Sequence, residues 1–108
     1  MRTLSFNVKG QIIERDPNCD FSGLVAGTEG YVKAKFTFSE DWNGCVKVVG
    51  FSSKGIEFEP CKLSGDNICE IPEKALQYHE FSIKVYGKRN GVRITTREAN
   101  IKQYGGKL

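Results

Sequence analysis

The sequence of 108 residues contains only one histidine, His79, and only one tryptophan, Trp42. A single histidine excludes metal sites that need several imidazoles, and no CxxC pair supplies the short ligand spacing of a structural zinc site. No apolar run approaches the ~20 residues of a membrane-spanning helix. The start of the sequence also lacks the apolar centre of a signal peptide. We therefore expect a cytoplasmic protein with no membrane anchor, no metal and no other cofactor.

Side chains that could perform catalysis are also few. His79 comes just before a predicted strand, where a histidine usually faces solvent. Glu57 and Glu59 are two positions apart, as solvated residues on one face of a strand often are. The glycine-rich run 87–91 lacks the strand-to-helix context of a phosphate-binding loop. We therefore expect no catalytic residues and no enzymatic activity.

The charge balance and the cysteine content fit a small intracellular domain. The 16 Lys and Arg against 13 Asp and Glu give a net charge of +3. This excess is smaller than that of a domain with a basic stripe for nucleic acid. Without a sign of secretion, the cysteines are predicted to be free thiols that act as small apolar residues, with one incidental bridge as the alternative. They are Cys19, Cys45, Cys61 and Cys69.

Short segments with alternating apolar and polar residues predict an all-β fold. The clearest is 31–39, where Val32, Ala34 and Phe36 alternate with polar or charged residues at a period of two. Glycine-rich turns separate the segments, and this spacing is typical of a sandwich or a small barrel. The predicted strands are 3–8, 11–14, 21–25, 31–39, 45–51, 56–58, 61–63, 67–71, 81–86, 92–96 and 99–104.

Turn signals connect these strands. Ser64-Gly65-Asp66 predicts a hairpin between 61–63 and 67–71, and Asn90-Gly91 predicts another between 81–86 and 92–96. Pro72 at a first helical position predicts one helical turn over 72–76. The predicted architecture is a small antiparallel β-sandwich, Ig-like or jelly-roll-like, with one short helical turn. It forms a single domain over 1–104, followed by a flexible tail at 105–108.

Basic residues occupy outward positions on several predicted strands. They are Lys33, Lys35, Lys84, Arg93 and Arg97. If these strands are neighbours, the cations form one basic face with Tyr31 and Tyr86 interleaved. Such a face could grip nucleic acid through phosphates and base stacking, pair with acidic groups on a protein partner, or simply be solvated.

Trp42 follows the strand 31–39 in a polar loop. Its indole either folds back to cap the core or stands exposed as an anchor for a partner, a role in which tryptophan is enriched. The candidate partner-binding residues are Trp42, Tyr31, Tyr86, Lys84 and Arg93.

The order of several motifs resembles a known family. The motifs are Leu4-Ser5-Phe6-Asn7-Val8, the run 34–42 that ends in Phe-Ser-Glu-Asp-Trp, Cys69-Glu70-Ile71-Pro72, the run 81–87 that ends in Tyr-Gly, and Ile94-Thr95-Thr96. In this order the sequence resembles the N-terminal β-domain of baseplate upper and tail-fibre proteins from phages of Gram-positive bacteria. The resemblance implies a virion assembly module, made in the host cytoplasm, that binds other phage virion proteins and itself.

Two other functions stay open at the level of the sequence. A small phage-encoded inhibitor of a host enzyme or defence complex would bind a host protein in a salt-sensitive way. A nucleic-acid-binding β-domain would use the basic face, although the small net charge disfavours it.

Overall fold

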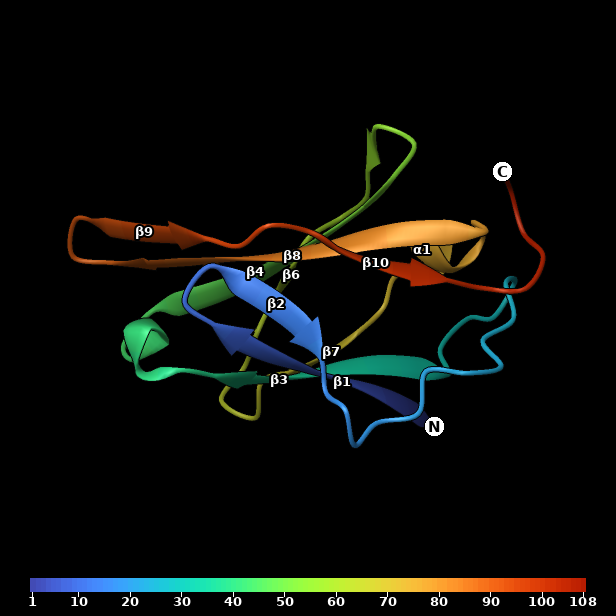
Figure 1. Cartoon of the computed structure of the whole chain (residues 1–108). Coiled ribbons are helices and arrows are strands. Elements are labelled where there is room, and N and C mark those ends of the chain that lie inside the picture. Colours follow the sequence, from blue (N-terminus) through green and yellow to red (C-terminus); the bar gives the residue numbers. More distant parts are fainter.

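The computed structural model describes all 108 residues and places them in two β-sheets that pack face to face (Figure 1). The four-stranded sheet has the order β2-β1-β3-β7, and its strands are β1 (Arg2–Lys9), β2 (Ile12–Arg15), β3 (Val32–Phe38) and β7 (Ile68–Glu70). The six-stranded sheet has the order β10-β8-β4-β5, with β6 also paired to β4 and β9 to β8. Its strands are β4 (Val46–Ser53), β5 (Ile56–Glu57), β6 (Cys61–Lys62), β8 (Glu80–Arg89), β9 (Val92–Thr95) and β10 (Ala99–Lys102).

The predicted fold class, a small all-β sandwich with one short helical turn, is confirmed. The turn is α1 (Glu73–Leu76), which begins directly after Pro72, and a second short segment, the 3-10 helix η1 (Glu40–Trp42), joins β3 to β4. One strand pair departs from the antiparallel pattern, because β1 and β3 run parallel. The antiparallel strand β2 brings the chain back toward the start of β1, and the segment 16–31 then passes β1 and leads to the start of β3.

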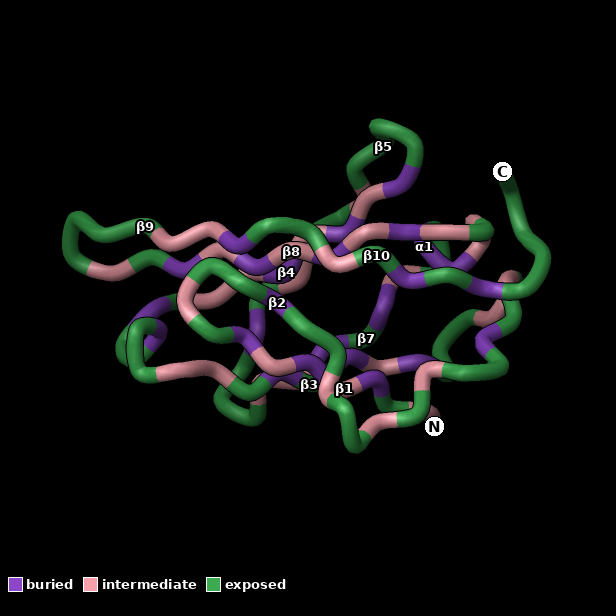
Figure 2. Tube along the Cα trace, viewed as in Figure 1, coloured by how far each residue is buried: buried purple, intermediate pink, exposed green.

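The core lies between the two sheets and follows the alternation of the strands. In the four-stranded sheet Leu4 and Phe6 of β1 are completely buried, and Phe36 of β3 lies opposite Phe6. In the six-stranded sheet the inward residues include Val49 of β4 and Ile83 of β8, both completely buried. In Figure 2 buried stretches alternate with less buried ones along the strands of both layers. The sandwich is elongated, measuring 42 × 29 × 21 Å.

The predicted strand at 21–25 is wrong. This stretch is a loop, and only Val25 makes an isolated bridge, to Tyr104. Its apolar residues are explained by packing instead of pairing, since the Phe21 ring packs edge-on against Phe6 with centroids 5.4 Å apart. Gly23 adopts a positive φ of 71°, which turns the chain where a strand would continue straight.

The predicted hairpin at Ser64-Gly65-Asp66 is also wrong. β6, before this turn, pairs with β4 in the six-stranded sheet, whereas β7, after it, pairs with β3 in the four-stranded sheet. The segment therefore crosses from one sheet to the other. Asn67 redirects the chain with a left-handed φ of 58°, a conformation that asparagine tolerates better than most residues. The other predicted hairpin, at Asn90-Gly91, is confirmed by the pairing of β8 with β9.

The C-terminal residues 105–108 were expected to form a flexible tail, and the structure attaches them to the domain. The Lys107 N–H donates to the Gln77 carbonyl at 2.8 Å, and the Lys107 carbonyl accepts from the His79 N–H at 2.7 Å. The ordered contacts thus extend beyond the predicted boundary at Tyr104. No helix in the structure is long and apolar enough to cross a membrane.

Candidate protein-binding face

Trp42 is buried and belongs to the core. Its indole N–H donates to the Gly10 carbonyl at 2.9 Å, and its ring lies against the backbone of Gly87 in β8. A methyl group at Gly87 would lie 2.6 Å from the Trp42 ring, so the glycine is what allows this contact. The capping interpretation of Trp42 is therefore confirmed. Its use as a partner contact is wrong, because no part of the side chain reaches the surface.

The loop that carries Trp42 is held by a residue that the sequence analysis did not single out. The Arg89 guanidinium donates to the carbonyl oxygens of Asp41 at 2.8 Å and Asn43 at 2.6 Å. On the other side the Ser39 hydroxyl accepts from the Gly10 N–H at 3.0 Å. The Phe-Ser-Glu-Asp-Trp motif thus has a structural role: its hydrogen bonds hold the connection between β3 and β4 against β8 and the β1–β2 turn.

The single basic face expected from the sequence does not form. Lys33 and Lys35 lie on β3 in the four-stranded sheet, whereas Lys84 and Arg93 lie on β8 and β9 in the six-stranded sheet. The periodicity showed which residues point outward, but not which strands are neighbours. Tyr31, which is 52% exposed, precedes β3 and is likewise separate from Tyr86 on β8.

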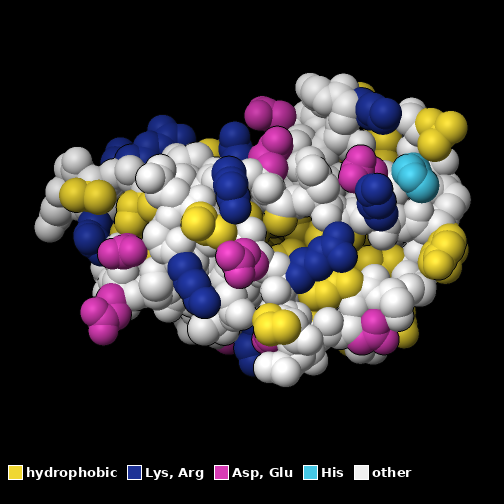
Figure 3. All heavy atoms as spheres, in the orientation of Figure 1, with side chains coloured by type: hydrophobic (Ala, Val, Ile, Leu, Met, Phe, Trp, Pro, Cys, Tyr) yellow, Lys and Arg dark blue, Asp and Glu magenta, His cyan; other side chains and the backbone are white.

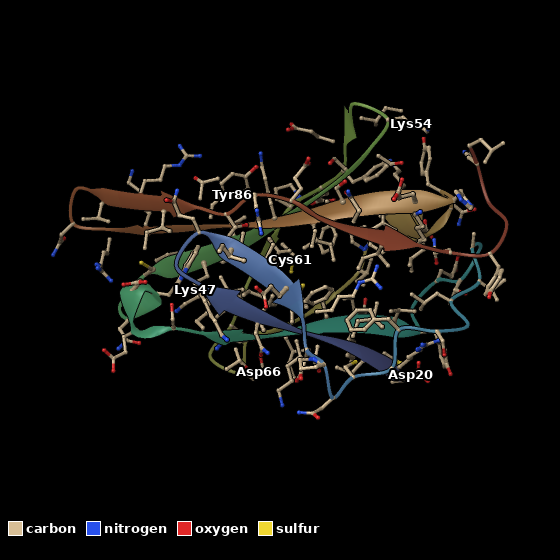
Figure 4. All side chains as sticks on the ribbon, in the orientation of Figure 1. Asp20, Lys47, Lys54, Cys61, Asp66 and Tyr86 are labelled. Carbon is tan, nitrogen blue, oxygen red and sulfur yellow. The ribbon has the colours of Figure 1, made fainter.

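Three of the five candidate residues do come together on the outer side of the six-stranded sheet. The Lys84 Nζ lies 5.4 Å from the centroid of the Tyr86 ring, and the Arg93 guanidinium carbon lies 5.5 Å from it. Both distances are within the range of a cation–π contact. Figure 4 shows Tyr86 on the upper layer, which is this sheet. Tyr86 is therefore flanked by two cations on an accessible surface.

The strand register adds further residues to this surface. Val46 lies opposite Lys88, and Val48 lies opposite Tyr86. Lys88 also lies opposite Arg93 on the other side. Directly opposed residues in antiparallel strands share one face of the sheet, so all of these side chains point outward. We name this surface the Tyr86 face, and it consists of Val46, Val48, Gly50, Lys84, Tyr86, Lys88 and Arg93.

Gly50 determines how the Tyr86 ring lies. A methyl group built at Gly50 would be 3.1 Å from Tyr86 Cε2 and 3.5 Å from its hydroxyl oxygen. The ring therefore lies over the bare backbone of β4 instead of standing away from the sheet. The ring is half-buried in this position and lies on the same face as Val46, which is 53% exposed.

A hollow borders the Tyr86 face on the side of the β4–β5 hairpin, which projects away from both layers in Figure 1. Phe58 and Pro60 form part of its wall, and the carboxylates of Glu57 and Glu98 lie at its rim. Glu98 accepts a hydrogen bond from the Ser52 hydroxyl at 3.4 Å. Two cations, Lys88 and Arg93, thus lie near the β8–β9 end of the face, whereas Lys84 lines the same hollow as the carboxylates near β5.

The space-filling view agrees with this arrangement of charges. In Figure 3 the Lys and Arg groups at the upper left lie over the β8–β9 end, and Asp and Glu groups follow them along the upper side. Four residues of this surface were not among the candidates from the sequence: Val46, Val48, Gly50 and Lys88. Alternation along 81–86 could have indicated Lys88, which continues the outward series, whereas Val46 and Gly50 depend on the pairing of β4 with β8.

Chemically, the Tyr86 face offers an aromatic surface, apolar contact and charged groups of both signs. No group of three or more His, Cys, Asp or Glu side chains is placed to hold a metal ion. No protein-family model matches the chain, and no curated protein matches it either. The arrangement is suited to contact with another macromolecule.

Proposed function

We propose that the protein is a non-enzymatic structural or adaptor module of a phage virion, which docks onto other virion proteins through the Tyr86 face. The observation that carries this proposal is the Tyr86 ring, which lies over Gly50 beside Lys84 and Arg93 on the outer side of the sheet. Tyrosine and arginine are enriched in the residues that dominate binding energy at protein interfaces.

The Tyr86 ring is already positioned for an interface in the free protein. The absence of a side chain at Gly50 lets the ring lie against β4, and the two flanking cations favour this position of the ring. A side chain that is already held in place loses less conformational entropy when an interface forms. Tyr86 therefore suits the role of an anchor, with Val46 and Val48 extending the apolar contact beside it.

The arrangement of charges on the Tyr86 face indicates the charge pattern of a partner. Carboxylates should lie opposite Lys88 and Arg93, and cations should lie opposite Glu57 and Glu98. A second copy of this chain, turned by 180° about an axis through the face, meets both requirements. A two-fold contact uses the same patch on both subunits, so self-association through this face is part of the proposal.

The resemblance to phage baseplate and tail-fibre domains also supports the proposal, and the motifs that carry it lie in the core of the fold. Its motifs coincide with the residues that hold the sandwich together: Leu4 and Phe6 are buried, and Trp42 packs on Gly87. These residues specify a scaffold, and the outward positions of the same strands are free to differ between partners. The virion role rests on the resemblance, and the docking role rests on the Tyr86 face.

The test is a crosslinking pull-down with a tagged copy of the protein expressed during phage infection, together with mass spectrometry of purified particles. The proposal predicts recovery of tail, baseplate or head proteins and the presence of the chain in the particles. Recovery of a host enzyme or defence protein, with no signal in particles, would contradict it and support the inhibitor alternative. A gel shift with random DNA or RNA that persists at moderate salt would support the nucleic-acid alternative instead.

A further inference from the structure

Two cysteines meet at the edge where the chain crosses between the sheets. β6 and β7 lie side by side although they belong to different sheets. Cys61 on β6 lies opposite the buried Val49, and Cys69 on β7 lies opposite the buried Ala34. Because opposed residues share a face of their sheet, both thiols point into the space between the layers. Figure 4 shows Cys61 in this position.

The two thiols are neighbours with different access to solvent. β6 consists of Cys61 and Lys62 only and lies against β7, which carries Cys69 at its centre. Burial, and then the neighbouring Cys61, raise the pKa of Cys69 well above its ordinary value. Cys69 is only 5% exposed, whereas Cys61 is partly exposed. A surface hollow lined by Cys61, Pro60 and Glu70 opens at this edge. A small reagent can therefore reach Cys61 first.

The other two cysteines lie elsewhere and have other contacts. The Cys19 sulfur lies 3.3 Å from the Ser5 backbone nitrogen, and the Cys45 sulfur lies 3.8 Å from the Arg89 guanidinium. All four cysteines are free in the structure.

We propose that Cys61 and Cys69 form an oxidation site, which a small disulfide such as oxidised glutathione converts into an intramolecular disulfide that joins the two sheets. The Cys61 thiolate attacks one sulfur of oxidised glutathione, so a mixed disulfide forms and one glutathione thiolate leaves. The Cys69 thiol then gives up its proton and attacks the Cys61 sulfur, and the second glutathione leaves as a thiolate that takes up a proton. The protein loses two electrons and two protons, and one glutathione disulfide becomes two glutathione thiols.

The product fixes the edge of the sandwich. Cys61 is attached to β4 through β6, and Cys69 is attached to β3 through β7, so the new bond connects the central strands of the two layers. A crosslink between two segments limits how far they separate in the unfolded chain, which stabilises the folded state. The site does not depend on the Tyr86 face or on the proposed virion role.

The experiment treats the purified full chain with oxidised glutathione, blocks remaining thiols and digests the protein with trypsin for mass spectrometry. Trypsin cuts after Lys62, between the two cysteines. The disulfide therefore leaves peptides 55–62 and 63–74 joined, with two hydrogen atoms fewer than the separate peptides. The oxidised protein should also unfold at a higher temperature than the reduced protein, and a reducing agent should reverse both changes.

A matched variant separates the two chemical steps. Cys69→Ser keeps the size of the side chain but lacks the second thiol, so its reaction should stop at the mixed disulfide on Cys61. Cys19→Ser should form the Cys61–Cys69 disulfide as the unmodified chain does. A mixed disulfide that persists on Cys61 in the unmodified chain, or joined peptides that contain a different cysteine pair, would overturn the proposal.

Discussion

Trp42 and Tyr86 are aromatic residues on opposite sides of the same sheet, and their different surroundings give them different roles. Beneath the sheet, Trp42 packs on Gly87, bonds to Gly10 and lies in a loop held by Arg89. Above the sheet, Tyr86 lies over Gly50 beside Lys84 and Arg93. Each ring rests where a glycine leaves room, but only Tyr86 can reach another molecule.

The comparison teaches that composition alone does not distinguish an anchor for a partner from an anchor for the fold. Tyr86 and Gly87 are adjacent in β8, and the alternation of a strand sends them to opposite faces. A residue's function in this protein thus depends on which side of β8 it contacts. Changes below the sheet should alter stability, and changes above it should alter binding.

The largest effect is expected from Trp42→Ala. The substitution removes a completely buried indole and leaves a cavity, which should lower the free energy of unfolding by about 3–5 kcal/mol. Urea denaturation followed by circular dichroism measures this change. Trp42→Phe loses the hydrogen bond to Gly10 and part of the indole but still fills much of the site with an aromatic ring, so it should be clearly more stable than Trp42→Ala. Equal stability of the two variants would contradict the role assigned to the ring.

A glycine pair sharpens the contrast between the two faces. Gly87→Ala places a methyl group 2.6 Å from the buried Trp42 ring, and this overpacking should lower the free energy of unfolding by about 1–3 kcal/mol. Gly50→Ala places its methyl group 3.1 Å from the edge of Tyr86, whose side chain can move outward, so its effect should be smaller. Denaturant titration of both variants side by side gives the comparison. A larger loss of unfolding free energy for Gly50→Ala than for Gly87→Ala would contradict the assigned difference between the two faces.

Tyr86→Ala should destabilise the protein less than Trp42→Ala. Tyr86 is half-buried on the outer face, where its ring lies over Gly50 beside the two cations. Cation–π contacts at exposed sites contribute about 0.5–1 kcal/mol each, so the loss of two should lower the free energy of unfolding by about 1–2 kcal/mol. Differential scanning calorimetry measures this shift. A loss as large as that of Trp42→Ala would show that Tyr86 belongs to the core instead of a binding surface.

The smallest effect concerns Asp66, in the crossing between the sheets and away from both aromatic residues. Hydrogen bonds from the Ser64 hydroxyl and then the Ile68 N–H lower the pKa of Asp66 below its ordinary value of 3.8. Because the folded state lowers this pKa, the stabilisation is complete above the unfolded pKa and is lost as the pH falls through the folded one. Asp66→Asn should therefore lose less stability than the unmodified chain between about pH 5 and about pH 2. An unchanged pH dependence would contradict the assignment.

The strands could be predicted from the sequence because alternation reports directly on a half-buried sheet. It placed Val32, Ala34 and Phe36 in the core, where the structure has them. The turn at Asn90-Gly91 was also predictable, since its conformation depends on these two residues. Local patterns of this kind need no knowledge of distant partners.

The errors concern contacts between segments that are distant in the sequence. Ser64-Gly65-Asp66 resembles a hairpin turn, but β6 and β7 each gain more by pairing with a longer strand, β4 and β3. Strand pairing also explains why Lys33 and Lys84 lie on different sheets, and why Val46 lies on the Tyr86 face. The binding surface is a product of strand order, which periodicity along one strand does not contain.

The most direct test compares the unmodified chain with Tyr86→Ala/Arg93→Glu in the crosslinking pull-down during phage infection. Tyr31→Ala is the matched control, because it removes an exposed tyrosine outside the Tyr86 face. Circular dichroism first confirms that all three proteins are folded. The account predicts that the double variant loses the crosslinks to virion proteins and its place in purified particles, whereas Tyr31→Ala keeps both. Undiminished recovery of virion proteins by the double variant would contradict it.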